Sequence, residues 1–190
     1  MNLLNPPFKR VLETLSTAEK SLDDLISKAH AQINLSLSIQ QDIHWLNTLA
    51  PIDDVLDEIH RFFAPINHLN AVKNSLELRA VYEACLQKLS VFHTELSQRE
   101  AYYNLHVKVN EALQPKTDAV SLIKKQALKW ALRDFRLSGV HLPTEEKSKL
   151  LKIEQRLAEL SSTFSNHVLD CTDDFSHRIT DEKRMAGLSE

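Results

Sequence analysis

Residues 142–171 decide the fold, and they read LPTEEKSKLLKIEQRLAELSSTFSNHVLDC. Apolar residues recur in this stretch at intervals of three, four, three, four, four and three, close to the heptad spacing of packed helices. These residues are Leu150, Ile153, Leu157, Leu160, Phe164, Val168 and Cys171. The spacing predicts a helix of about 40 Å, at 1.5 Å per residue, that packs into a core along this seam. Thr144 is the expected N-cap, with Glu145 and Glu146 stabilised at the positive end of the helix.

Composition extends the helical prediction to the whole chain. The 190 residues include 2 glycines and 6 prolines; 43% are hydrophobic, 26% are charged, and the net charge is −3. This is the composition of a globular domain and not of a disordered or membrane-spanning chain. Sheet folds and phosphate-binding loops need glycine wherever the backbone reaches positive φ, and Gly139 and Gly187 cannot supply those turns. We therefore predict an all-α protein, an antiparallel helical bundle with one long helix hairpin.

Five further helices are expected, over residues 17–35, 43–72, 74–96, 100–112 and 118–137. Residues 33–39 also alternate between apolar and polar side chains, as a strand does. The sequence offers no partner strand, so we favour a helix that ends in a loop near residues 35–42. Pro51 fits a first helical turn, whereas Pro65 is expected to kink or restart its helix.

The same spacing predicts which side chains point inward. In the segment 43–72 these are Leu46, Leu49, Ile52, Leu56, Ile59 and Phe63. In the segment 118–137 they are Ile123, Ala127, Trp130 and Ala131. Asn74, with Glu77 three residues later, resembles a helix N-cap. Gly139 is well placed for the left-handed residue that commonly ends a helix.

We expect one helical domain in three parts: an extended arm over residues 1–16, a first helical group over 17–115, and a long hairpin with a C-terminal tail over 116–190. Cys85 and Cys171 fall on apolar helix positions, which favours two buried thiols in a reducing compartment. A disulfide between them stays open as the alternative. The sequence has neither a signal-peptide pattern nor a run of about 18 apolar residues, so we expect a cytoplasmic protein with no membrane partner.

Positive charge gathers in residues 116–156, which hold ten basic and five acidic residues, whereas residues 1–72 hold five and nine. Such an excess can contact a polyanion, but helices in a chain this charged usually carry similar solvated faces. Aromatic residues do not alternate with these lysines as a stacking platform for nucleic acid requires. We therefore predict no nucleic-acid partner.

The histidines do not form a zinc motif. A zinc site on a helix uses two histidines four residues apart, so that both imidazoles reach one ion. None of the 9 histidines has a partner three or four residues away. His60 and His68 are two turns apart, but Pro65 lies between them. We interpret the histidines as solvated or packed side chains and predict no metal residue in this chain.

The acidic residues and thiols also lack the companions that catalysis needs. A cluster of carboxylates consists of Asp53, Asp54, Asp57 and Glu58. A di-metal bundle would add a Glu-x-x-His motif from other helices, which the sequence lacks, so this cluster is interpreted as an acidic surface. Cys85 with a distant histidine would make a nucleophile pair, but its apolar helix position favours an inert thiol. We therefore predict no catalytic and no cofactor-binding residue.

Several blocks of the chain resemble a known family. They are residues 64–75 (APINHLNAVKNS), 77–80 (ELRA), 82–86 (YEACL), 132–143 (LRDFRLSGVHLP), 156–170 (RLAELSSTFSNHVLD) and 179–182 (ITDE). Together, in this order and without gaps inside a block, they resemble the N-terminal region of the thimet oligopeptidase and neurolysin family. The resemblance covers residues 43–190, and the first 42 residues match less distinctly.

The resemblance implies the N-terminal, non-catalytic lobe of a zinc metallo-oligopeptidase that cleaves short peptides in a channel between helical lobes. The family's zinc site is an HExxH motif with a downstream glutamate, and none of these residues maps onto this sequence. Zinc is therefore expected in a catalytic domain outside this chain, which is predicted to be inactive alone and to look like a piece of a longer enzyme. Its expected partners are that catalytic domain and short peptide substrates.

A second hypothesis is a freestanding helical module that binds a partner helix in an apolar groove and has no enzymatic activity. Reading the gene past Glu190 separates the two hypotheses. An HExxH motif there favours the peptidase, and an immediate stop codon favours the interaction module.

Overall fold

The computed structural model describes residues 14–73, 75–181, 184 and 187, and within them it contains helices and no strand. A short 3-10 turn, η1 (Leu15–Thr17), precedes six α-helices. These are α2 (Ala18–Ser38), α3 (Leu49–Val72), α4 (Leu76–Ser97), α5 (Glu100–Leu113), α6 (Ala119–Leu137) and α7 (Thr144–Asp174). The predicted all-α fold is confirmed. None of the described helices is long and apolar enough to cross a membrane.

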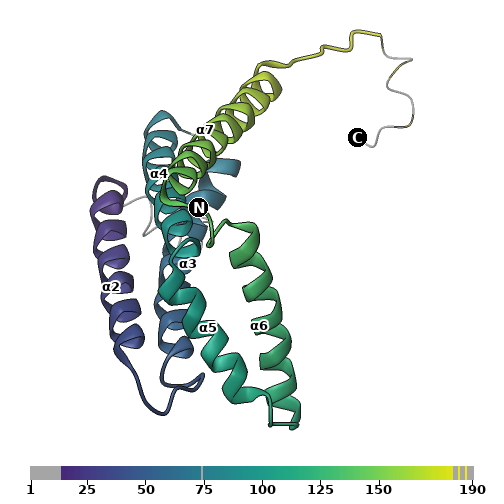
Figure 1. Ribbon diagram of the computed structural model, residues 1–190. Helices are drawn as coiled ribbons and strands as arrows, with labels where there is room; N and C mark the ends of the chain where they lie inside the picture. Colours follow the sequence, from purple (N-terminus) through teal and green to yellow (C-terminus); the bar gives the residue numbers. More distant parts are fainter. Residues whose placement is uncertain (1–13, 74, 182–183, 185–186, 188–190) are drawn as a thin grey trace.

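Three helices form the body of the molecule. α2, α3 and α4 pack against one another, α5 and α6 form a hairpin, and α7 packs on α4 (Figure 1). The C-terminal end of α7 projects beyond the other helices (Figure 1). Residues 1–13, most of the predicted extended arm, lie outside the described residues. Leu15 and Ser16, at the end of that arm, belong to η1 and are not extended.

The buried core comes from α2 to α6 and the turn after α6. Its largest cluster includes Leu22 and Ile33 of α2, Ile52 and Ile59 of α3, Cys85 and Phe92 of α4, Tyr102 and Val109 of α5, Leu128 and Phe135 of α6, and Val140. A smaller cluster joins η1 to α3 and α4 through Leu15, Ile66 and Leu78. No apolar side chain of α7 belongs to either cluster. The predicted packing of α7 along its apolar seam is therefore wrong.

α3 begins later than predicted and continues through Pro65, so the predicted restart of the helix at this proline does not occur. It begins at Leu49, because residues 43–48 form a turn region in which Leu46 is exposed. Pro51 does lie in the first turn, where its missing N–H costs no bond. Pro65 lies inside the helix and does not restart it. Ile66, directly after it, is buried and ties this part of α3 to the smaller cluster.

The helix caps follow the sequence in part. Ser75 is the N-cap of α4, and its hydroxyl accepts from the backbone N–H of Leu78; the predicted cap residue, Asn74, lies outside the described residues. Thr144 is the first residue of α7, whose N-cap position is Pro143 without a side-chain cap bond. Gly139 does adopt the predicted left-handed conformation, with φ +80.

α6 faces inward with a different set of side chains from the predicted one. Ile123 and Trp130 are 70% and 55% exposed, whereas Leu128 and Phe135 are buried. The helix has apolar residues around most of its circumference, so spacing alone does not select one face. α5 selects it, because the ring of Phe135 packs edge-on against the ring of Tyr102, 5.4 Å between centroids.

The two thiols lie in different environments, and both are free. Cys85 is buried in the main cluster, as predicted. Cys171 is exposed on α7, so its predicted burial is wrong, and the open alternative of a disulfide is not what the structure shows.

Candidate functional site

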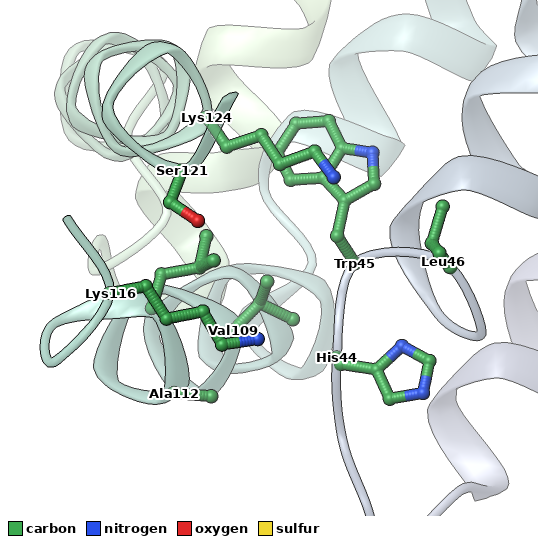
Figure 2. A pocket seen from close by; sticks show the side chains of 9 residues that line it. His44, Trp45, Leu46, Val109, Ala112, Lys116, Ser121 and Lys124 are labelled. Carbon is green, nitrogen blue, oxygen red and sulfur yellow. The ribbon is translucent and has the colours of Figure 1, made fainter. Parts of the chain in front are cut away.

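A small cavity lies where residues 44–46 approach α5 and α6 (Figure 2). It encloses about 300 Å³. The ammonium of Lys124 stands 5.6 Å from the centre of the Trp45 ring, a cation–π contact. The hydroxyl of Ser121 donates to the carboxylate of Asp118, 2.6 Å away. The cavity therefore lies between residues 39–48 and the α5–α6 hairpin, and Ser121 and Lys124 in its wall already contact Asp118 and Trp45.

A larger groove runs along the outer side of α6. It measures about 860 Å³ and is lined by α6 side chains from Leu122 to Leu137, with Asn110 of α5 and Gln114 at its other edge. We call it the α6 groove. Its lining includes four cations, Lys125, Lys129, Arg133 and Arg136, and no carboxylate. Trp130 and Leu137 also line it and are 55% and 77% exposed. The groove is therefore both apolar and positively charged.

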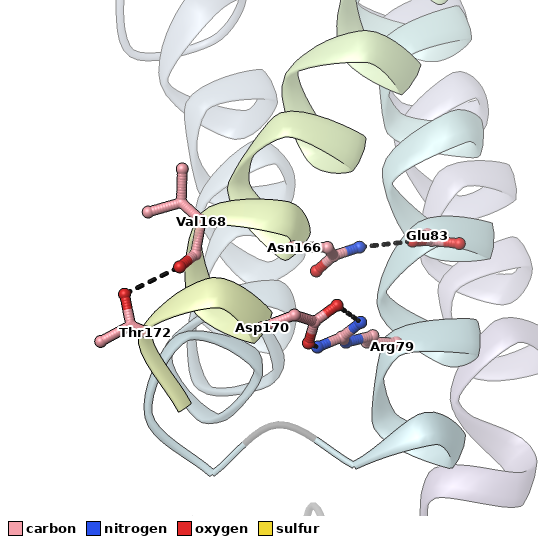
Figure 3. A network of polar contacts seen from close by, with 6 residues as sticks. All are labelled: Arg79, Glu83, Asn166, Val168, Asp170 and Thr172. Carbon is pink, nitrogen blue, oxygen red and sulfur yellow. Dashed lines mark hydrogen bonds and ion pairs between the residues drawn. The ribbon is translucent and has the colours of Figure 1, made fainter. Parts of the chain in front are cut away.

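α7 is held on α4 by its polar side (Figure 3). Arg79 of α4 donates hydrogen bonds to both carboxylate oxygens of Asp170, and the bond from its Nη1 atom measures 2.9 Å. One helical turn away, the side-chain amide of Asn166 donates to Glu83 at 2.9 Å. The hydrogen bond from Arg79 is the main reason why the pKa of Asp170 is lowered. Ser162 and Asn166 are the buried residues of α7, so polar groups set the orientation of this helix.

The opposite side of α7 is apolar and exposed. We call it the α7 face, and it consists of Ile153, Leu157, Leu160, Phe164, Val168 and Cys171. Its five large side chains are 47% to 69% exposed. Contiguous apolar surface on this scale usually marks a contact with another protein surface. Six of the seven residues that were predicted to form a buried seam, all except Leu150, thus form an exposed surface.

An aromatic cluster supports α6 from inside. The ring of His106 lies 4.5 Å from that of Tyr102 and 4.9 Å from that of Phe135, centroid to centroid. Nδ1 of His106 is 2.9 Å from the backbone carbonyl of Tyr102, and since a carbonyl only accepts, Nδ1 carries the proton. Burial lowers the pKa of His106. A neutral, bonded histidine inside a packed cluster has a structural role.

The predicted acidic cluster lies on the surface of α3 and is partly neutralised by cations. Asp57 pairs with Arg61 on the same helix, and Glu58 pairs with Lys28 of α2 at 2.6 Å. Asp53 is different: burial of its carboxyl, with the charge of Asp54, raises its pKa to about 6. Among the described residues no three histidines, cysteines or carboxylates gather as metal ligands.

His60 and His68 both lie on the exposed surface of α3. Burial raises the pKa of the Cys85 thiol to about 11, which keeps it protonated and unreactive at neutral pH. The sequence reasoning missed the α6 groove. The signal for it in the sequence is the net positive charge of residues 116–156. A solvated face explains that charge equally well, and helical spacing directs Trp130 inward, so the sequence alone does not reveal the groove.

The fold and the exposed surfaces described above define an all-α helical domain, and comparison with known proteins shows its family. Residues 9–147 match the N-terminal domain of the neurolysin/thimet oligopeptidase family. The chain belongs to this family.

Three relatives illustrate the relationship. The chain is 35% identical over 187 residues to oligopeptidase A of Escherichia coli (strain K12), covering 97% of this chain and 27% of the relative. It is 33% identical over 144 residues, 76% of this chain and 20% of the relative, to a probable cytosolic oligopeptidase A of Arabidopsis thaliana. It is 30% identical over 184 residues, 96% of this chain and 22% of the relative, to an organellar oligopeptidase A, chloroplastic/mitochondrial, of the same plant. The chain thus spans about a quarter of the length of these relatives.

Proposed function

We propose that this chain is the N-terminal, non-catalytic lobe of a zinc metallo-oligopeptidase that hydrolyses short peptides, and that it helps to wall the substrate channel. The family match over residues 9–147 supports the peptidase assignment. In this proposal the zinc is held by another part of the polypeptide, since the described residues do not gather a set of metal ligands. We also propose a cytoplasmic location, which agrees with the name of one plant relative and differs from that of the other.

The observation that carries the proposal is the α7 face. A helix fixed to its own domain by Arg79, Glu83 and Asn166 presents Leu157, Phe164 and their neighbours to solvent. Removing such side chains from water contributes about 25 cal/mol per Å² of apolar area. A rigid apolar face of this kind suits packing against a second lobe, and a wall acts by narrowing access without contributing chemistry of its own.

The test uses a hybrid enzyme. The segment of the Escherichia coli relative that this chain matches is replaced by the chain, and hydrolysis of an internally quenched oligopeptide is measured with and without a chelator. We expect a chelator-sensitive hybrid and no hydrolysis by the 190-residue chain alone. Chelator-sensitive hydrolysis by the chain alone would refute the non-catalytic assignment.

The α7 face is tested in the same hybrid. The double change Leu157→Asp with Phe164→Asp places two charges on this face. It should lower both the yield of soluble hybrid enzyme and its activity at least tenfold. Leu35→Asp, at a side chain of α2 that is 62% exposed, is the matched control and should leave both unchanged. Equal activity of all three hybrids would contradict the packing role of the α7 face.

A second function, the freestanding interaction module, predicts the same exposed face with a different occupant. It is favoured if the 190-residue chain binds a separate protein through the α7 face while the hybrid enzyme is inactive. The activity of the hybrid therefore separates the two.

A further inference from the structure

The α6 groove carries a pattern that the peptidase proposal does not use. Leu122, Gln126, Trp130, Arg133 and Leu137 follow one another at intervals of four, four, three and four residues, and all five line the groove. This is the spacing with which one helix packs against another. The interior of the domain does not use it, because α6 packs inward through Leu128 and Phe135.

The charges of the groove fall into two groups. Lys125 donates to the backbone carbonyls of Gln114 and Lys116, at 2.9 and 2.7 Å, and Arg133 pairs with Asp134 at 2.7 Å. Lys129 and Arg136 form no ion pair with the described residues. They are seven residues apart, which corresponds to about 10.5 Å along a helix, and both line the α6 groove together with Trp130.

We propose that the α6 groove binds an acidic amphipathic helix of a partner protein. Two carboxylates separated by two turns of that helix pair with Lys129 and Arg136. Apolar side chains between them pack on Trp130 and Leu137. The charge complementarity follows from four cations and no carboxylate among the residues that line the groove. Leu122, Trp130 and Leu137 supply the apolar part of the helix-in-groove contact. This proposal is independent of the peptidase assignment.

The apolar side chains of the groove favour a protein over a nucleic acid as its ligand. Single-stranded nucleic acid binds through successive aromatic platforms along a basic path, and Trp130 is the one aromatic residue that lines this groove. Leu122 and Leu137, which lie on either side of it, would gain nothing from a phosphate backbone. The apolar face of a partner helix, in contrast, would cover Leu122 and Leu137.

The experiment measures binding of labelled synthetic helices to the 190-residue chain by fluorescence anisotropy. The probe carries glutamates at positions i and i+7 with leucine and phenylalanine between them, and the control probe carries glutamine in place of both glutamates. We expect the glutamate probe to bind about tenfold tighter, as two new ion pairs at a partly exposed site allow. The Trp45→Phe variant leaves Trp130 as the only tryptophan, so its emission should change on binding.

Protein variants assign the binding to the groove. The double variant Lys129→Glu with Arg136→Glu should bind the glutamate probe at least tenfold more weakly than the unchanged chain does. It should instead bind a probe that carries lysines at the same two positions. The pair Lys20→Glu with Lys152→Glu, at exposed positions of α2 and α7, makes the same change in net charge and should alter binding less than twofold. Trp130→Ala should weaken the binding of both the glutamate probe and the glutamine probe.

Three results would overturn the proposal. The first is no detectable binding of the glutamate probe at about 1 mM peptide. The second is equal weakening by the groove pair and by the control pair, which would show a net-charge effect. The third is tighter binding of a single-stranded oligonucleotide of equal charge than of the glutamate probe.

Discussion

Arg79 of α4 and Asp170 of α7, 91 residues apart in the sequence, form a two-point ion pair that fixes which side of α7 faces the domain. Arginine matches a carboxylate with two parallel N–H bonds, so the pair fixes orientation as well as distance. The consequence is an inverted arrangement. α7 docks through polar residues, and its apolar stripe faces outward.

Removing this pair should loosen α7. In a double-mutant cycle, Arg79→Met and Asp170→Asn should each lower the Tm and speed hydrogen exchange in α7, and the double variant should lose little more than either single one. The pKa of Asp170 is lowered from 3.8, so the pair stabilises the folded state above pH 3.8 and this contribution is lost at lower pH. Additive Tm losses at pH 7 would show that the two residues act separately.

The α7 face should be dispensable for the stability of this chain. Leu157→Ser with Phe164→Ser should change the free energy of unfolding by no more than about 0.5 kcal/mol per site, as at other surface positions, and should reduce self-association. Leu78→Ala, at a residue only 1% exposed, should cost about 2–5 kcal/mol. Urea unfolding and sedimentation measure the two effects. A large loss of stability in the serine variant would mean that the α7 face is packed within the domain.

Gly139→Ala should destabilise the turn between α6 and α7. The residue has φ +80, and an added Cβ would lie 2.5 Å from Cδ1 of Leu142. The left-handed backbone costs about 1–2 kcal/mol for a residue with a side chain, and Leu142 must also move. Gly187→Ala is the comparison, since its φ is +98 but nothing lies within 4 Å of its Cβ position. Thermal unfolding should show the larger loss at position 139.

Asp53→Asn should raise the Tm at pH 7.5. The pKa of Asp53 in the folded chain is raised from 3.8 to about 6, so above pH 6 the folded state holds a charge that the protein environment disfavours. Between pH 6 and pH 3.8 the native state binds the proton more tightly than the unfolded chain, and below pH 3.8 both states are protonated. The gain from asparagine should therefore shrink as the pH falls through this window. A gain that does not change between pH 7.5 and pH 4 would contradict the raised pKa.

The two cysteines should differ in reactivity. A thiol reagent at pH 7.5 should modify one cysteine per native chain, Cys171, because Cys85 is buried and the pKa of its thiol is raised to about 11. Denaturant should expose the second. In the hybrid enzyme the same reagent reports on the α7 face, to which Cys171 belongs, and its modification should slow when that face is covered. Fast modification in an active hybrid would show that this end of the face stays open.

The sequence by itself determined the secondary structure. Apolar spacing and caps located five of the helices within a few residues and placed α3 six residues too early at its start, and the requirement for positive φ at Gly139 was readable from its position after Leu137 and Ser138. These features depend on neighbours in the chain. The blocks between residues 64 and 182 also indicated the family, which the family match over residues 9–147 and the similarity to the Escherichia coli relative confirm.

Only the tertiary structure decided which helix faces are buried. Ile123 and Trp130 satisfied the spacing rule as well as Leu128 and Phe135 did. The aromatic rings of α5 hold Phe135 inward, and Leu128 joins the same buried cluster. On α7, the apolar stripe from Ile153 to Val168 would have formed a core in most helices, but Arg79 and Glu83 of α4 bind the polar side. Spacing predicts that a helix has an apolar side, whereas the direction of that side depends on partners distant in the sequence.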